Sequence, residues 1–140
     1  MDIKELICQL ADPESSIEDI LINAASDGNT EIVKFLLEAK VNPNPNVQSN
    51  RWTALIWASD NGHTKIVKLL LEAKANPNVQ SNARWTALMG ASRYGHTKIV
   101  KFLLEAGANP NVPDPYGNTA LSLTRNPEIK NLLIRAGAKT

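Results

Sequence analysis

A segment of 27 residues occurs twice in this chain, 33 residues apart, and this repetition limits the possible folds more than any other feature. Residues 53–79 and 86–112 differ at six positions and are identical at 21. A fixed period of this length is typical of repeat proteins, in which each copy is one supersecondary unit. A single unit cannot bury its apolar face alone, so neighbouring copies must stack to form a shared core.

The pattern within each copy predicts two short helices joined by a turn. In the earlier copy Thr53 is a suitable N-cap for the first helix, and Gly62 is expected to end that helix in the left-handed conformation. A second helix is expected to begin at Thr64 and to bury a stripe of aliphatic residues over 66–71. The pair Asn76-Pro77 is expected to stop it, and an Asn- and Ser-rich link then leads to the next copy.

Less regular segments flank the two closest copies. Residues 2–11 have apolar side chains at helical spacing, so we expect a half-repeat that covers one end of the stack. Ser15 and Glu18 are expected to form a capping box for the helix that follows. The last copy lacks three residues in its turn and has a polar outer face, as a capping repeat requires. We therefore predict one domain over residues 1–140, with an N-terminal capping helix (1–15), three repeats (16–47, 48–80 and 81–113) and a truncated C-terminal capping repeat (114–140).

The same short motifs recur, with small changes, in successive copies. In the earlier of the two closest copies they are Thr53-Ala54-Leu55, Ala58, Gly62-His63, Ile66-Val67, Leu70-Leu71 and Ala75-Asn76-Pro77-Asn78. With these motifs, the helix–turn–helix units of 33 residues resemble the ankyrin repeat over about residues 16–138. The resemblance implies an all-α solenoid of stacked units with short hairpin-like links and capping ends. It also implies a non-enzymatic module that binds a partner protein through its concave face and link tips.

Four basic residues depart from the ankyrin pattern. Arg51 and Arg84 stand where the last copy keeps a turn glycine, and Lys40 and Lys74 stand where later copies keep a helix-ending glycine. If these residues are left-handed, each non-glycine side chain costs about 1 kcal/mol.

The residues show no pattern suited to catalysis or to a metal ion. The two histidines, His63 and His96, occupy the same repeat position, so they should lie about 10 Å apart. That distance is too long for a shared metal ion, whose ligands lie about 2 Å away, and we expect each histidine to hydrogen-bond to the backbone. No facing pair of carboxylates suits acid–base work, and Cys8 is expected to be a small packing residue. We therefore expect no enzymatic activity, no catalytic residue, no cofactor and no metal.

Composition bears on partners and location. The net charge of +1 gives no general attraction to nucleic acid or to an anionic membrane. No stretch approaches the 18 or so apolar residues that a membrane-spanning helix needs, so no membrane insertion is expected. One cysteine cannot form an intramolecular disulfide, which favours a reducing, cytoplasmic compartment. We expect a monomeric chain whose partner is another protein.

The differences between the two closest copies indicate where a partner would bind. Three of the six change size, charge or aromaticity on the part of the first helix expected to be exposed: Trp57/Gly90, Asp60/Arg93 and Asn61/Tyr94. Trp, Tyr and Arg are enriched in binding hot spots, and the links add several. The predicted partner-binding residues are Trp57, Asp60, Asn61, Arg93, Tyr94, Trp52, Trp85, Tyr116, Arg51 and Arg84.

Other interpretations of the same residues remain open. Drift on an unconstrained surface would produce the same differences between copies, and Trp52 and Trp85 could simply pack on the adjacent link. A nucleic-acid- or anion-binding module would use the arginines and lysines, although glutamates alternate with the lysines. The similarity of the two closest copies also fits a consensus-like or engineered scaffold without a natural partner.

Overall fold

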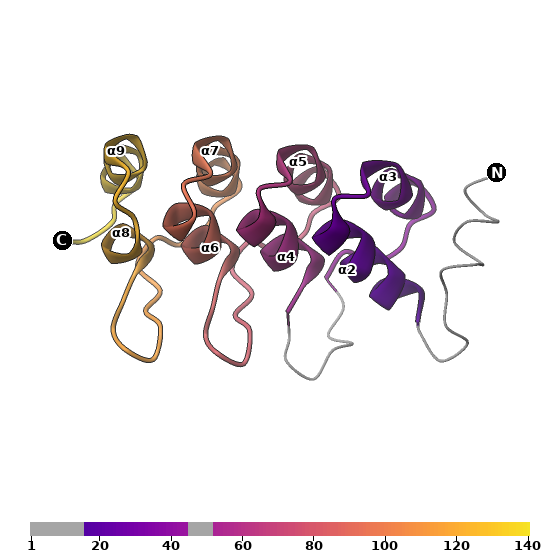
Figure 1. Ribbon diagram of the computed structural model, residues 1–140, viewed down its shortest axis with the longest axis horizontal. Coiled ribbons are helices and arrows are strands. Elements are labelled where there is room, and N and C mark those ends of the chain that lie inside the picture. The colour runs from indigo at the N-terminus through magenta and orange to yellow at the C-terminus, as the bar shows by residue number, and fades with distance from the viewer. Residues whose placement is uncertain (1–15, 45–51) are drawn as a thin grey trace.

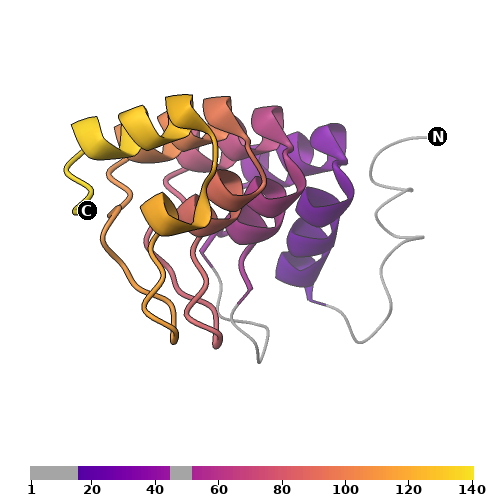
Figure 2. The same cartoon turned by 60° about the vertical axis from the view of Figure 1, so that its left-hand side comes forward.

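The computed structural model describes residues 16–44 and 52–140, and within them eight helices stack as four successive pairs (Figures 1 and 2). The predicted capping helix at 1–15 lies outside the described residues. None of these eight helices has both the length and the apolar character needed to cross a membrane. The helices are α2 (Ile17–Asp27), α3 (Thr30–Glu38), α4 (Ala54–Asn61), α5 (Thr64–Glu72), α6 (Ala87–Arg93), α7 (Thr97–Glu105), α8 (Ala120–Leu123) and α9 (Pro127–Arg135).

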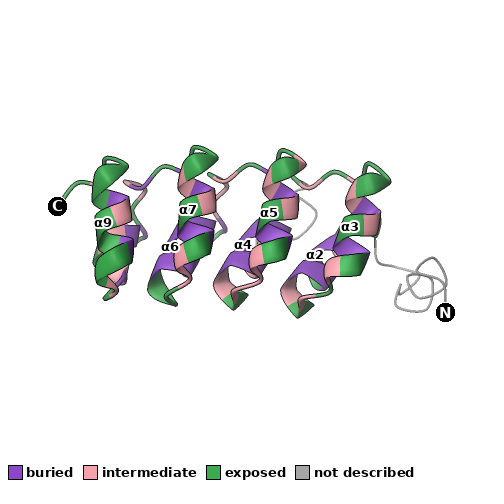
Figure 3. Cartoon of the chain, turned by 90° about the horizontal axis from the view of Figure 1, so that it is seen from above, coloured by how far each residue is buried: buried purple, intermediate pink, exposed green. Residues whose placement is uncertain are grey.

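Each pair forms one layer of a linear stack. The first helices of the pairs are α2, α4, α6 and α8, and they are called the inner helices here. The long links that the structure describes lead into α6 and α8 (Figure 1). The second helices (α3, α5, α7 and α9) form the opposite, outer row, and their upper faces are exposed to solvent (Figure 3). Inner helices pack against inner helices of the next layer, and outer helices against outer helices. This arrangement confirms the predicted all-α ankyrin-type solenoid.

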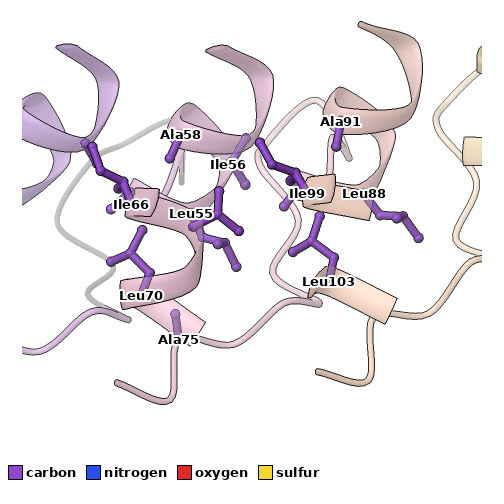
Figure 4. Packing of buried hydrophobic residues seen from close by; sticks show 14 of the residues in the cluster. Leu55, Ile56, Ala58, Ile66, Leu70, Ala75, Leu88, Ala91, Ile99 and Leu103 are labelled. Carbon is purple, nitrogen blue, oxygen red and sulfur yellow. The ribbon is translucent and has the colours of Figure 1, made fainter. Parts of the chain in front are cut away.

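The core runs without interruption through the layers because the same positions are apolar in each copy. Leu55, Ile56 and Ala58 of α4 are at most 2% exposed. They pack with the aliphatic stripe of α5, in which Ile66 and Leu70 are fully buried (Figure 4). Burying a leucine or isoleucine side chain contributes about 1.5–3 kcal/mol. A layer without neighbours would expose much of this surface, so the layers depend on one another for stability.

The starts of the helices confirm the predicted threonine N-caps, but the predicted capping box before α2 is wrong by one residue. The Thr53 hydroxyl accepts from the Ile56 amide at 3.2 Å, as predicted for an N-cap. The capping box of α2 is formed by Ser16 and Asp19, one residue later than expected. Helix α2 begins at Ile17, which places Ser16 at the N-cap, and the Asp19 carboxylate accepts from the Ser16 amide at 3.2 Å.

The predicted stop signal of the outer helices is wrong. Helix α5 ends at Glu72, before the Asn-Pro pair, because the chain turns through a left-handed Lys74 (φ 71°). The Ala75 amide then donates to the Leu70 carbonyl at 2.9 Å, which satisfies one of the free carbonyls at the helix end. Lys40 (φ 67°) is also left-handed, so the condition stated for these helix ends is met by both lysines.

An asparagine after each Asn-Pro pair links successive layers. The Asn78 side chain donates to the Gly107 carbonyl at 3.1 Å and accepts from the Asn109 amide at 2.7 Å. Asn111 forms the corresponding pair of bonds with the Gly137 carbonyl and the Lys139 amide, at 3.1 and 2.8 Å. The links therefore fix the spacing of the layers on this side of the stack.

Candidate functional site

The predicted partner-binding residues that the structure describes lie on or next to the inner helices and in the links and hairpins before them, and these parts together are called the inner surface here. Arg51 falls outside the described residues. The hairpins project from one side of the stack (Figure 1). In the hairpin before α6, the Ser81 amide donates to the Trp85 carbonyl at 2.9 Å. Arg84 lies at its tip, exposed and left-handed (φ 58°), like Gly117 at the corresponding position of the last copy (φ 83°).

Two predicted residues of the inner surface form an aromatic pair. The ring centroids of Trp52 and Trp57 are 4.7 Å apart, and the ring planes are inclined by 37°. Both side chains are partly buried against the core. Aromatic pairs of this kind contribute about 0.5–1.5 kcal/mol beyond the area that they bury. Trp57 therefore has a structural role in addition to any contact with a partner.

Asp60 is held between two layers. The Trp85 indole Nε1 donates to both of its carboxylate oxygens, at 2.9 and 3.2 Å. The carboxylate lies directly over Gly90, where a Cβ would overlap it. Burial raises the pKa of Asp60 to about 6, although the Trp85 hydrogen bond and the nearby His96 act to lower it.

The expectation that all three variable pairs are exposed is therefore wrong for Gly90, and Trp57 and Asp60 are only partly exposed. Gly90 is buried, and its lack of a side chain makes room for the Asp60 carboxylate of the preceding layer. The change from Trp57 to Gly90 is linked to packing between layers. Asn61, Arg93 and Tyr94 are exposed, as expected.

The histidines lie in the turns between layers, as predicted. The Nε2 atom of His63 is 3.0 Å from the Ser26 carbonyl oxygen. His96 is placed in the same way, with Nε2 at 3.1 Å from the Asp60 carbonyl oxygen. The Asn61 side chain donates to the same Ser26 carbonyl at 3.1 Å. These bonds join the ends of α2 and α4 to the turn of the following layer, and they confirm the structural interpretation of both histidines.

The last hairpin carries Tyr116, whose side chain is 90% exposed. Asp114 organises this hairpin, since its carboxylate accepts from the Tyr116 and Asn118 amides at 2.8 Å each. Desolvation acts to raise the pKa of Asp114, but these bonds and a further one from the Asn118 side chain lower it overall. Tyr116 is thus exposed to solvent on a turn that is held in place by hydrogen bonds to the Asp114 carboxylate.

A hollow of about 470 Å³ lies at the C-terminal end of the inner surface. Sequence reasoning located two of its residues, Arg93 and Tyr94, and missed Arg125. The sequence signal for Arg125 was the three-residue deletion in the last copy, which replaces the Gly-His turn. The hollow is lined by Arg93, Tyr94, Asn118, Ser122, Leu123 and Arg125.

The described ranges contain no group of three or more histidine, cysteine, aspartate or glutamate residues that could hold a metal ion. Asp60 is the carboxylate with the raised pKa, yet it is already bonded to an indole and covers a glycine. Its position suits packing between layers better than proton transfer to a substrate.

The comparisons with known proteins agree with this architecture. The family model for ankyrin repeats (three copies) matches residues 2–81 and again 74–140. A search of curated proteins finds no match. Ankyrin repeat domains are generally protein–protein interaction modules and are typically non-catalytic. Stacked helix pairs, turn histidines and projecting hairpins are all present here, and together with this match they show that the chain belongs to the ankyrin repeat family.

Proposed function

We propose that this chain binds a partner protein through its inner surface, with the C-terminal half of that surface as the main contact. The observation that carries the proposal is the exposure of two tyrosines on a fixed framework. The side chains of Tyr94 and Tyr116 are 56% and 90% exposed. Tyrosine is enriched at binding hot spots because it offers a large contact area and a polar end.

The remaining predicted residues divide into two groups. Asp60, Asn61 and Trp85 hydrogen-bond to neighbouring layers, and Trp57 stacks on Trp52. These residues would hold the inner surface in shape, and their exposed atoms would add to the contact with the partner. Arg84, Arg93 and the two tyrosines would reach the partner directly. A preformed surface limits the conformational entropy lost on association.

The proposal includes the remaining expectations from the sequence. The chain would act without enzymatic activity, as a monomer, in a reducing cytoplasmic compartment. The match to ankyrin repeats, which are typically non-catalytic, supports the first of these expectations. Size-exclusion chromatography with light scattering would test the second.

The test is affinity capture with three versions of the chain, followed by cross-linking of the retained protein. The double variant Tyr94→Ala/Tyr116→Ala should lose the partner that the wild type retains. Ile134→Ala is the matched control, since Ile134 is 49% exposed but lies on the outer helix α9. We expect cross-links from the partner to map to the inner surface. Equal retention by the double variant, or cross-links confined to outer helices, would show that the proposed surface is wrong.

A further inference from the structure

The hollow at the C-terminal end of the inner surface exists because the last repeat is shortened. In the earlier layers a histidine ring covers the glycine turn. A Cβ on Gly28 would lie 2.8 Å from His63 Cε1, and one on Gly62 would lie 2.7 Å from His96 Cε1. The last copy has no histidine, and nothing lies within 4 Å of a Cβ built on Gly95. The turn after α6 is therefore left open, and the hollow adjoins it.

Two arginines from different layers line this opening. Arg93 is the last residue of α6, and Arg125 follows α8 closely in the next layer. Both side chains are exposed. No acidic residue lines the hollow. Among the described residues the ion pair is Lys101–Glu128, at 3.8 Å, and neither arginine takes part in one. The hollow is thus lined by two arginines and by no carboxylate.

The charge at the ends of the inner helices changes sign along the stack. Asp27 is the exposed last residue of α2, and Asp60 lies near the end of α4. Arg93 takes the place of Asp60 in the following layer, and Arg125 lies beyond it. With layers about 10 Å apart, the exposed acid and the first arginine are separated by about 20 Å. An extended peptide crosses that distance with about six residues.

We propose that this hollow binds an acidic side chain of an extended peptide segment in the partner protein. The planar guanidinium groups of Arg93 and Arg125 match the geometry of a carboxylate, and the exposed Tyr94 ring offers a surface beside them. The size of the hollow falls within the range of ligand-binding pockets. A polyanion such as a single-stranded nucleic acid fits less well, because it would meet Asp27 and Asp60 along the same row. This inference rests on the proposed function and specifies the partner's chemistry at one point.

The experiment is an NMR titration of the isotope-labelled full chain with two matched probes. One is an acetylated and amidated hexapeptide with two central glutamates, and the other has two central glutamines. We expect the glutamate peptide to shift the Nε–H signals of Arg93 and Arg125 and the amide signal of Tyr94. The shifts should weaken as salt concentration rises. The glutamine peptide should leave these signals in place.

Neutral variants connect the effect to the two arginines. Arg93→Gln/Arg125→Gln should weaken binding of the glutamate peptide about tenfold, the size expected for losing charge-assisted contacts. Lys98→Gln removes an exposed charge from the outer helix α7 and should have no effect. Both arginines are exposed, so the thermal unfolding curve should not change.

Several results would overturn the inference. The glutamine peptide could bind equally well, or the arginine double variant could bind as the wild type does. A thymidine oligonucleotide or inorganic phosphate could produce the same shifts at lower concentration, which would assign the hollow to nucleic acid or to a free anion. If a captured partner depends on the tyrosines but not on the two arginines, the inference fails and the proposed function stands. If capture does not depend on the tyrosines either, both fail.

Discussion

The substitution Lys74→Gly should stabilise the protein, although it removes a side chain. Lys74 has a φ of 71°, a conformation in which a Cβ is crowded by the following carbonyl. Gly107 occupies the same position one layer later, with a φ of 93°. The backbone bonds at the two sites correspond, since the Lys74 carbonyl accepts from the Asn44 side chain at 2.9 Å and the Gly107 carbonyl accepts from Asn78 at 3.1 Å. Glycine at position 74 can therefore keep every backbone bond.

The size of the gain follows from two opposing effects. A left-handed residue with a Cβ costs about 1–2 kcal/mol relative to glycine. Glycine in turn loses about 0.5–1 kcal/mol more conformational entropy on folding. The difference predicts an increase of about 0.5–1 kcal/mol in the free energy of unfolding. For a chain of 140 residues this corresponds to a rise in Tm of about 1–4 °C.

Thermal and urea unfolding of the wild type and three variants would measure this effect. Lys74→Ala is the matched control, because it removes the charge and keeps the Cβ, and it should give no gain. Gly107→Ala is the reverse substitution. Nothing lies within 4 Å of a Cβ built on Gly107, so any loss of stability reports the backbone conformation alone, and we expect about 1 kcal/mol. The reasoning is refuted if Lys74→Gly leaves the Tm unchanged or lower, or if Lys74→Ala raises it equally.

Two further substitutions test the contacts between layers. The folded pKa of Asp60, about 6, lies above its ordinary value of 3.8, so wild-type stability should fall as the pH rises from about 4 through 6. Asp60→Asn keeps an acceptor for the Trp85 indole and should remove this dependence. The full pKa difference corresponds to about 3 kcal/mol, but solvent reaches the carboxylate, so we expect a gain of about 1–2 kcal/mol above pH 7. Parallel urea curves with the same pH slope for both proteins would contradict this. The Ser92 hydroxyl is buried without a hydrogen-bond partner among the described residues, so Ser92→Ala should raise the unfolding free energy by up to about 1 kcal/mol in the same assay. A clear loss would show that the hydroxyl is bonded.

The sequence predicts the features that depend on residues close together in one copy. The Thr53 cap and the left-handed Gly62 are set by local hydrogen bonds and local sterics, which the spacing of the copy reveals. The left-handed Lys74 could be predicted because aligned copies have glycine at that position. The shift of the α2 capping box from Ser15 to Ser16 shows the limit of such reasoning, because adjacent serines offer two equally suitable caps.

Contacts between copies could not be obtained in the same way. Nothing in a single copy shows that the Asp60 carboxylate reaches the space above Gly90, since that depends on how far apart the layers lie. These positions differ between the copies, and such differences are typical of exposed residues, so the sequence favours a surface position for both. The opening beside Arg125 could not be predicted from the sequence either. The deletion is visible in the sequence, but which side chains border the gap depends on the path of the shortened turn.

The contact between Asp60 and Gly90 has a consequence for how such a chain can be rebuilt or can evolve. Two copies that agree at 21 of 27 positions look like interchangeable modules. They are not equivalent, because Gly90 leaves room for the aspartate carboxylate of the preceding copy, whereas a side chain at that position would force the carboxylate to move. A tandem duplication of residues 53–85 would place the indole of a second Trp57 where the carboxylate needs open space. The order of the two copies therefore matters. A longer array made by duplicating the first copy would also need a change at the new junction, either at the aspartate or at the tryptophan that faces it.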